Sequence, residues 1–598
     1  MFTIIKQLFN LLTPSQRKRF FVLQVLVVIM AIVEIIGIAS ILPFMALVGD
    51  MTLIQQDTYI GQLYQISGID SVSQFIFLLG VIVLVMLFLS ASVSMYTVWK
   101  LSMFAHRIGV EISSSLYTYY LRQNWLFHTK VNSSQLTKKI ATETQRITQG
   151  VLVPLMHMNA KVVLALLLSL TLFVYDPKVA IIGLLTFSLA YIFLYKIVRS
   201  QLAQNGKKIS EMNEQRFRLK SEGFGGIKDI LLLGRGNDLI KRFNKTGDTL
   251  AHSHGANAAL AQAPRYFMEL VAFGTMILLV LYLVSSHNGN LGIILPILSV
   301  YALAGFKLLP AFQQIYASAA TIKGSISAFE SIQQDLRNSI KIDNKIVTAD
   351  KNFLPLKEKI SLENITFTYP GKAIPAINQL NMQIPVNSLI GVVGSSGAGK
   401  STLIDIILGL IVPQKGQLKV DDTIINSQNS RSWQNMIGFV AQSIYLSDGS
   451  IAENIAFGIQ KSQIDLEKVR DTLKLAQLTE LVNGLENDIE TLVGERGVQL
   501  SGGQQQRIGI ARALYHDAEL LVFDEATSSL DGITEKMIME SIINLTGQKT
   551  IVLIAHRLKT VQKCDQIFFI DEGKVIDQGT YERLIKTNER FKHMAAHA

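Results

Sequence analysis

A glycine-rich segment at residues 394–402 has the composition of a phosphate-binding loop. It reads Gly-Ser-Ser-Gly-Ala-Gly-Lys-Ser-Thr. Glycines let backbone N–H groups approach phosphate oxygens because no Cβ stands in the way. Lys400 can then reach the β- and γ-phosphates of a nucleotide, and the Ser401 hydroxyl can ligate Mg²⁺. The expected nucleotide-binding residues are Gly394, Ser395, Ser396, Gly397, Ala398, Gly399, Lys400, Ser401 and Thr402.

Two adjacent acidic residues stand at the end of an apolar segment further along the chain. Glu519–Asp524 contains four apolar residues and ends in a carboxylate, and Glu525 follows directly. Behind a phosphate-binding loop, Asp524 is placed to hold Mg²⁺ through water. Glu525 can polarise an attacking water molecule, which is the role of a general base. Surface charge is the alternative interpretation, and the loop argues against it.

A parallel α/β sheet is needed to position these groups. The apolar Leu389–Val393 predicts a buried strand before the loop, and residues 402–410 predict a helix whose N-terminal dipole faces the phosphate. Residues 519–524 predict a second buried strand that delivers its carboxylate to the C-terminal edge of the sheet, where α/β sheets bind ligands. A ligand-free glycine turn is the alternative for the loop, and the preceding strand disfavours it.

Further side chains extend these motifs into a resemblance to the ATP-binding cassette (ABC) family. Tyr369 stands where that family stacks an aromatic on adenine, Gln442 matches the glutamine that senses Mg²⁺ and the transmembrane partner, and His556 matches the switch histidine. The resemblance also covers the signature motif at Ser501, Gly502, Gly503 and Gln504, the D-loop at Ser529, Leu530 and Asp531, and the contact segment of exporters at residues 491–497. A lone histidine or aromatic is usually structural, but these pieces follow the family's order.

The resemblance implies the cofactors and the roles at the site. ATP and Mg²⁺ are expected as cofactors. The catalytic residues would be Glu525, His556 and Gln442, and the metal would be held by Ser401, Gln442 and Asp524.

A signature motif also implies a second cassette. In the ABC family this motif caps the γ-phosphate of ATP bound to the opposite cassette, and one chain carries one cassette. Because Glu525, His556 and the signature are all intact, the resemblance favours a homodimer with two competent sites. An unseen partner chain is the alternative.

Composition places the rest of the chain in a membrane. The 598 residues predict several domains. Hydrophobic residues make up 49%, concentrated in the first half. The net charge of +10 is explained by basic residues flanking membrane segments, and no nucleic-acid partner is expected because no basic–aromatic module occurs. The single cysteine, Cys564, excludes an internal disulfide and a cysteine-based metal cluster.

Six apolar segments have the length of a transmembrane helix, which needs about 20 residues. They are residues 20–47, 75–99, 152–175, 179–198, 266–285 and 291–315. Residues 1–18 predict a short amphipathic elbow helix on the cytoplasmic surface. Residues 100–150 and 199–265 are rich in Lys and Arg, whereas 49–73 contains neither. The positive-inside rule therefore places the N-terminus, both long loops and the cassette in the cytoplasm, with a bacterial inner membrane as the expected location.

These observations predict an α-helical six-span transmembrane domain fused to an α/β P-loop ATPase cassette. The expected divisions are residues 1–325 for the transmembrane domain, 326–356 for a linker and 357–598 for the cassette. Amphipathic runs at 101–121 and 200–219 predict extensions of the membrane helices. This resembles the exporter type of ABC half-transporter, whose loops end in coupling helices that rest on the cassettes.

Ionisable residues inside the predicted spans bear on the cargo, because such residues are expensive and usually functional. Lys307 has no acid nearby in sequence, and a lysine in a cavity suits an anionic head group. Arg265 is the other candidate substrate residue, with pairing to Glu269 across one helical turn as the structural alternative. Lys161 either snorkels or pairs with Glu34.

Residues 263–270 and 306–311 resemble the lipid-linked oligosaccharide flippases of bacterial protein N-glycosylation. In that family a short external helix contacts the polyprenyl tail, and residues 60–66 predict such a helix. The sequence departs from the family by a lysine at 307, where arginine is usual, and by the lack of a basic residue in 81–90. The resemblance implies ATP-driven flipping of a polyprenyl-diphosphate-linked oligosaccharide to the outer leaflet, with membrane lipid as partner. Export of another lipid, a peptide or a drug is the alternative, followed by an ATP-gated channel or regulator.

Overall fold

The computed structural model describes residues 7, 9–10, 12–49, 51–54, 59–69, 71–175, 177–286, 291–343, 352–526, 531–555 and 557–596. The chain divides into two compact units. The first comprises Met1–Gln123 and Phe127–Ile346, and the second comprises Asn124–Leu126 and Val347–Ala598. The divisions expected near residues 325 and 356 stay predictions.

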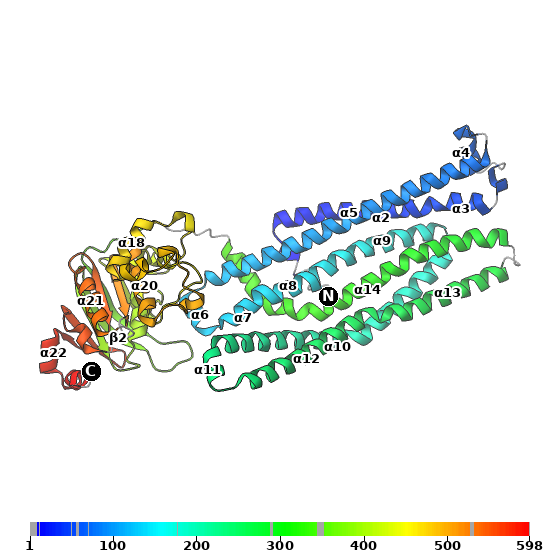
Figure 1. The fold of residues 1–598 in the computed structure, drawn as a ribbon. Helices are drawn as coiled ribbons and strands as arrows, with labels where there is room; N and C mark the ends of the chain where they lie inside the picture. The colour runs from blue at the N-terminus through cyan, green and yellow to red at the C-terminus, as the bar shows by residue number, and fades with distance from the viewer. Residues whose placement is uncertain are drawn as a thin grey trace. The chain divides into compact units, whose positions relative to one another are not determined.

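The first unit is built from long helices (Figure 1). Its elements are α2 (Pro14–Ala39), α3 (Ile41–Gly49), η1 (Met51–Ile54), α4 (Tyr59–Ser67), α5 (Val72–Leu121), α6 (Trp125–Lys130, which begins in the second unit), α7 (Ser133–Lys138), the π-helix η2 (Lys139–Glu143), α8 (Thr144–Ile147), the π-helix η3 (Thr148–Leu152), α9 (Val153–Tyr175), α10 (Pro177–Gly225), α11 (Ile227–Leu232), α12 (Gly236–Gln262), α13 (Pro264–Ser286) and α14 (Leu291–Asp343).

Three of these helices are far longer than a membrane crossing requires. α5 has 50 residues, α10 has 49 and α14 has 53, whereas about 20 residues span the hydrocarbon core. The runs at 101–121 and 200–219 are therefore continuous with the helices that precede them, which confirms the predicted extensions. α14 also passes without a break through residue 325.

Three helical stretches of the described residues are long and apolar enough to cross a membrane. They run over residues 14–45, 72–121 and 133–174, and each overlaps one of the first three expected spans. The other expected spans, 179–198, 266–285 and 291–315, lie in α10, α13 and α14. Each of these includes positions whose side chains are outside the described part of the chain.

The first long helix begins within the segment expected to form an elbow. Thr13 caps α2, because its hydroxyl accepts the N–H of Gln16 at 3.3 Å while the Gln16 side chain accepts the N–H of Thr13 at 2.7 Å. This is a capping box, and Pro14 follows it at the first helical position. Most of the preceding residues lie outside the described part.

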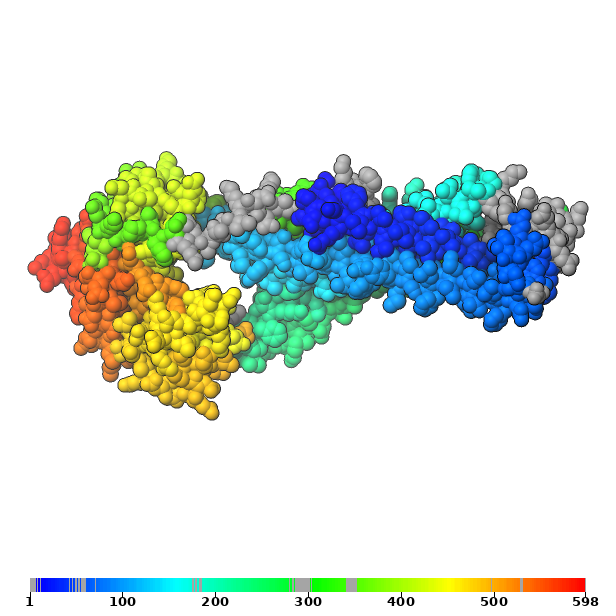
Figure 2. Space-filling model, turned by 90° about the horizontal axis from the view of Figure 1, so that it is seen from above, coloured from blue at the N-terminus to red at the C-terminus, as the bar shows by residue number. Residues whose placement is uncertain are grey.

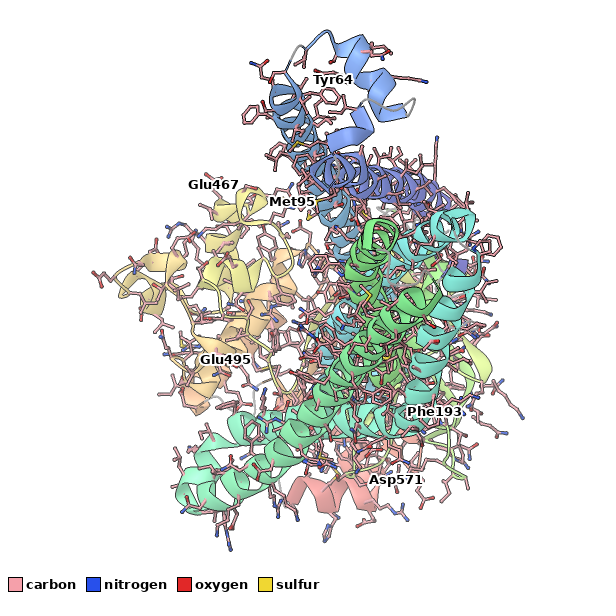
Figure 3. The ribbon with its side chains drawn as sticks, turned by 90° about the vertical axis from the view of Figure 1, so that its right-hand side faces the viewer. Tyr64, Met95, Phe193, Glu467, Glu495 and Asp571 are labelled. Carbon is pink, nitrogen blue, oxygen red and sulfur yellow. The ribbon has the colours of Figure 1, made fainter. Side chains whose placement is uncertain are left out.

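A short helix follows the first span, as the sequence predicts for residues 60–66. α4 covers Tyr59–Ser67. Tyr64 packs edge-on against Phe75 of α5, with ring centroids 5.1 Å apart (Figure 3). Leu63 and Ile66 are exposed, so α4 presents apolar side chains on its outer side.

The helices of the first unit approach closely where small residues face one another. A Cβ on Gly150 of η3 would lie 2.1 Å from the Ser325 hydroxyl oxygen of α14. A Cβ on Gly206 of α10 would lie 2.3 Å from the carbonyl oxygen of Gly324. Larger residues would force these helices apart, as in other membrane bundles that pack through small side chains.

The outer surface of the bundle is apolar. Phe77, Phe88 and Met95 of α5 and Phe193 of α10 are exposed, and Figure 3 labels the last two. Figure 2 shows α2 lying alongside α5 on one face. Such a surface is suited to lipid, because a soluble protein rarely exposes contiguous apolar area of this extent.

Among the residues that the structure describes, the second unit forms two sheets. The antiparallel sheet has the order β2-β1-β4-β5, and the larger sheet has the order β10-β9-β3-β8-β7-β6. The strands are β1 (Lys359–Phe367), β2 (Ile377–Pro385), β3 (Leu389–Gly394), β4 (Lys415–Val420), β5 (Thr423–Ile424), β6 (Ile437–Val440), β7 (Leu520–Asp524), β8 (Thr550–Ile554), β9 (Gln566–Asp571) and β10 (Lys574–Gly579). β9, β3, β8, β7 and β6 are parallel, so their carboxyl ends meet at one edge.

Short helices connect and cover these strands. They are α15 (Lys400–Ile407), α16 (Ser430–Gln434), α17 (Ile451–Ile455), α18 (Leu466–Leu475), α19 (Thr479–Asn483), α20 (Gly502–Tyr515), α21 (Gly532–Ile543), α22 (Tyr581–Thr587) and α23 (Glu589–Ala596), with 3₁₀ turns η4 (Lys461–Gln463), η5 (Asp488–Glu490), η6 (Glu495–Gly497) and η7 (Leu558–Val561). The strands β3 and β7, which carry the predicted chemistry, are almost fully buried.

Candidate active site

The glycine-rich loop joins the central strand β3 to helix α15. Gly397 and Gly399 have φ of +81° and +102°, which lie in the left-handed region that side chains disfavour. A Cβ on Gly394 would lie 2.1 Å from the carbonyl oxygen of Ile570 in the neighbouring strand β9. The loop conformation therefore requires glycine at these positions, and it opens onto the first turn of α15.

Lys400 is folded over this loop. Its Nζ donates to the carbonyl oxygens of Gly394 and Ser395, each at 2.9 Å, and its side chain is buried. Burial lowers the pKa of Lys400, while the carboxylates of Glu525 and Asp524 oppose that lowering. The ammonium is thus held by neutral oxygens within the electrostatic reach of the acidic pair.

The acidic pair lies at the carboxyl end of β7. Asp524 is paired in register with Ile554 of β8. Glu525 has φ of +51°, a strained conformation for a residue with a side chain, and its N–H donates to the carbonyl oxygen of Ile554 at 3.0 Å. Gln442 Nε2 donates to Glu525 Oε2 at 2.8 Å. The structure therefore brings together two predicted catalytic residues that are 83 positions apart.

Tyr369 lies beside the first turn of α15. Its hydroxyl and the Thr402 hydroxyl are 3.2 Å apart, and its ring packs edge-on against Phe367 with centroids 5.0 Å apart. The ring is half-buried. Tyr369 is thus placed next to the loop, and its stacking on adenine stays a prediction.

The signature residues cap helix α20. The Ser501 hydroxyl accepts the N–H of Gln504 at 3.3 Å, and the Gln504 side chain accepts the N–H of Ser501 at 2.9 Å. This capping box leaves Ser501 and Gly502 exposed. The N-terminus of a 14-residue helix is therefore presented at the surface, where its dipole favours an anion.

The remaining predicted residues are placed as follows. Ser396 and Ser401 are exposed, and Ala398 is buried with its N–H donating to the carbonyl oxygen of Ser395 at 3.2 Å. Asp531 caps α21, and the N–H of Thr534 lowers the pKa of its carboxyl. His556, Ser529 and Leu530 lie outside the described residues.

Two family models match the chain in consecutive segments. The model described as the ABC transporter transmembrane region matches residues 39–306, and the model described as ABC transporter matches residues 377–528, which contain the loop, the signature and the acidic pair. The chain is an ABC transporter. The transporter is a membrane protein that carries a helical membrane domain and an ATPase domain on one chain, and it hydrolyses ATP to drive transport.

Relatives of the transporter include flippases. The ATP-dependent lipid A-core flippase of Shewanella denitrificans is 27% identical, with 98% of this chain and 96% of the relative covered. The flippase of the same name from Shewanella frigidimarina is 26% identical over 87% and 85% of the two chains. The heterocyst differentiation ATP-binding protein HepA of Nostoc is 29% identical over 77% and 74%.

A solved structure shares the fold of the whole transporter. A bacterial Atm1-family ABC exporter with ATP bound aligns with a TM-score of 0.79, covering 96% of this chain and 98% of the other at 20% identity. The transporter therefore has an exporter-type fold, as the sequence predicts.

Two polar residues of the ATPase unit escaped the sequence analysis. Asp571, at the end of β9, accepts the Ser395 hydroxyl at 3.0 Å and Arg590 Nη1 at 2.9 Å. Its sequence signal is the same as that of Asp524, because an apolar strand ends in a carboxylate at the same edge of the sheet. Arg512 of α20 donates to the carbonyl oxygens of Asn454 at 2.8 Å and Tyr445 at 2.9 Å. No local pattern marks it.

Arg512 ties the signature helix to the segment that follows Gln442. Besides the two carbonyl contacts, its guanidinium lies over the Phe457 ring, 4.7 Å from the centroid. Asn454, whose carbonyl oxygen it binds, is fully buried. A shift of α20 must therefore move this segment as well.

The two candidate substrate residues of the membrane unit, Lys307 and Arg265, each have an acidic partner. Lys307 Nζ lies 3.8 Å from Glu34 Oε2, so Lys307 has an acid partner from another helix. The alternative in which Lys161 pairs with Glu34 is not what the structure shows. Arg265 Nε donates to Glu269 Oε1 at 2.8 Å, which is the pairing within one helix that the sequence allows.

Proposed function

We propose that the transporter is a flippase of the bacterial inner membrane whose cargo is an amphiphile with a phosphate head, most specifically a polyprenyl-diphosphate-linked oligosaccharide. The cargo moves from the cytoplasmic to the outer leaflet, with the N-terminus and the ATPase domain in the cytoplasm. The observation that carries the proposal is Lys307, a cation within an expected span whose side chain is 42% exposed. Ionisable residues inside membrane spans are rare and usually functional, and Lys307 keeps this exposure although a carboxylate lies 3.8 Å away.

The named relatives support a lipid cargo, and a second cation supports an anionic head group. Arg265 opens the expected fifth span and is largely exposed despite its pairing with Glu269. Two of the relatives are named as flippases of a lipid, lipid A-core. Helix α4 adds an apolar outer side at Leu63 and Ile66 that suits a prenyl tail.

The ATPase unit fits Mg²⁺–ATP. A glycine-rich loop with left-handed backbone at Gly397 and Gly399, a buried ammonium at Lys400 and an exposed hydroxyl at Ser401 are what phosphate oxygens and a magnesium ion require. Mg²⁺ is usually held by one or two carboxylates together with phosphates, which Asp524 satisfies. Bound ATP supplies the phosphoanhydride bond whose cleavage drives transport.

The chain's residues divide the hydrolytic work. Lys400 orients the phosphates, and Tyr369 contacts adenine. Glu525 takes a proton from water as the general base, and Gln442 holds its carboxylate through the 2.8 Å hydrogen bond. We assign His556 to the γ-phosphate from the family resemblance.

A second copy of the chain completes the sites. Ser501 and Gly502 leave the α20 N-terminus exposed, as a site that caps ATP on another cassette requires. In the membrane unit, the α10–α11 tip exposes Phe224 and three consecutive leucines, Leu231, Leu232 and Leu233. An apolar surface of this kind needs a cover, and the cassette of a homodimeric partner is the occupant we propose.

The test is flipping of a polyprenyl-diphosphate oligosaccharide in proteoliposomes, comparing wild type with Glu525→Gln. We expect ATP-dependent flipping in wild type only. In the variant, ATP binding is retained and hydrolysis falls by about 100-fold or more, because a general base contributes on that order. Steady hydrolysis in Glu525→Gln would refute the base assignment.

Absence of flipping alongside normal wild-type ATPase activity would discard the glycan cargo. The names of the relatives favour one second candidate, a lipid of the lipid A-core type. The same vesicles loaded with that lipid would distinguish the two cargoes.

A further inference from the structure

Glu34 is a buried carboxylate in the C-terminal part of helix α2, which ends at Ala39. Its residue is 6% exposed. The Ser94 hydroxyl of α5 donates to its Oε1 at 2.8 Å, and the Lys307 ammonium of α14 lies 3.8 Å from its Oε2. Three helices thus meet at one carboxylate. A charge at this depth persists only with such partners, because hydrocarbon offers no solvation.

The two side chains of the ion pair differ in their solvent exposure. The side chain of Glu34 is 7% exposed and that of Lys307 is 42% exposed. Their 3.8 Å separation exceeds hydrogen-bond length, so the ammonium can turn its N–H donors to a second acceptor. Glu34 is therefore the fixed half of the pair, and Lys307 is the half that an entering head group can reach.

We propose that Glu34 is the counter-ion that competes with the cargo's phosphate for Lys307 and thereby sets how tightly the head group is held. This role rests on the proposed function. A phosphate at Lys307 is attracted by the ammonium and repelled by the carboxylate, so the pair offers a nearly neutral site. A flippase must release its cargo in the outer leaflet, and a lone buried lysine would retain a diphosphate too strongly. Glu34 restores the ion pair as the head group leaves.

The Glu269–Arg265 pair of the membrane unit differs from the Glu34–Lys307 pair in the helices that it joins. Glu269 binds Arg265 from the same helix at 2.8 Å, and the arginine is largely exposed. Both members of that pair lie on α13, so its geometry does not depend on how neighbouring helices are placed. The Glu34–Lys307 pair joins α2 to α14, so its strength depends on how these helices are placed.

The test uses Glu34→Gln in full-length transporter reconstituted in nanodiscs of neutral lipid. The amide keeps the shape of the side chain and can accept the Ser94 hydroxyl, but it carries no charge. The probe is a polyprenyl diphosphate, titrated while ATPase stimulation is measured, and flipping of the same probe is followed in vesicles. We expect half-maximal stimulation at about tenfold lower probe concentration, which corresponds to 1.4 kcal/mol. The maximal flipping rate should fall, because release becomes slower.

The control is Glu330→Gln, which changes an exposed carboxylate of α14, the helix that carries Lys307, and should shift neither quantity. Glu34→Asp, which withdraws the charge from Lys307 by one methylene, should shift both in the same direction by a smaller factor. Glu34→Asp replaces Glu34→Gln as the test variant if the glutamine variant fails to fold. In a Lys307→Gln background, Glu34→Gln should shift the half-maximal concentration by a smaller factor than in wild type, because the competition requires the lysine and only the direct repulsion by the carboxylate remains.

A folded Glu34→Gln protein with unchanged half-maximal concentration would overturn the counter-ion role. Tighter binding with a lower maximal flipping rate would support it. If wild type itself ignores the polyprenyl diphosphate, the proposed cargo fails, and the counter-ion role fails with it.

Discussion

Lys400 in the ATPase unit and Lys307 in the membrane unit are both held by oxygen atoms, but the oxygens differ in kind. Lys400 donates to two neutral backbone carbonyls at 2.9 Å. Lys307 faces a carboxylate at 3.8 Å. A phosphate is a stronger partner than a carbonyl, because charge-assisted hydrogen bonds are about twice as strong as neutral ones. At Lys400, a phosphate therefore replaces weaker partners and gains binding free energy. At Lys307, a phosphate replaces an existing ionic partner, so one anion is exchanged for another.

The largest expected effect comes from removing the lysine that has no anionic competitor in hydrogen-bond contact. Lys400→Ala should lower ATPase activity by roughly 100-fold or more, as loss of one preorganised electrostatic donor does elsewhere. Activity of purified protein at saturating ATP measures this, and Lys586→Ala, at an exposed lysine of α22, is the control. A loss under tenfold would mean that Lys400 is not the main phosphate contact.

A smaller effect is expected at the paired lysine. Lys307→Ala should lower cargo-stimulated flipping by about tenfold, because one modest electrostatic contact is lost. The variant also leaves Glu34 buried without its cation, so its melting temperature should fall, and adding Glu34→Gln should restore it. Lys323→Ala on the same helix is the control. Equal flipping rates in Lys307→Ala and wild type would mean that Lys307 does not contact the head group, and its comparison with Lys400 would no longer hold.

Arg265→Ala should have a weaker effect on flipping than Lys307→Ala. Its guanidinium is largely exposed and already bonded to Glu269. The same flipping assay decides the order, and a larger loss at Arg265 would make that residue the principal head-group contact.

The smallest effect concerns a group that the ATPase unit keeps neutral. Burial, with help from Asp565, raises the pKa of the Cys564 thiol to about 12, from about 8.5 in an unfolded chain. The thiolate is the reactive form, so alkylation at pH 8 should be slow in native protein and fast in denaturant. Because the folded pKa is raised, native protein binds more protons, and stability should decline as pH rises above about 8.5. Equal alkylation rates in both states would contradict the burial of this side chain.

The local parts of the ATP site were predictable from the sequence because each depends on neighbouring residues. The apolar runs before residues 394–402 and before Asp524 predict the strands β3 and β7, the run after 402 predicts helix α15, and Ser501 with Gln504 has the spacing of a capping box. The left-handed φ of Glu525 was not predictable, since a side chain rarely adopts it.

Contacts between distant segments could not be derived in the same way. The Glu34–Lys307 pair depends on how α2 and α14 pack, and no spacing in the sequence encodes that packing. Arg512 looks like any basic residue of a helix until its contacts with Asn454 and Tyr445 are seen. Helix existence follows local apolar length, whereas charge pairing follows tertiary geometry.

The length of α5, α10 and α14 has a mechanical consequence. At 1.5 Å of rise per residue, a helix of 50 residues such as α5 is about 75 Å long. Its backbone hydrogen bonds run without interruption, so it resists bending and acts as a lever arm. A small tilt at one end becomes a displacement of several ångströms at the other. A proline inserted midway would kink the helix, so the displacement would no longer be transmitted to the far end.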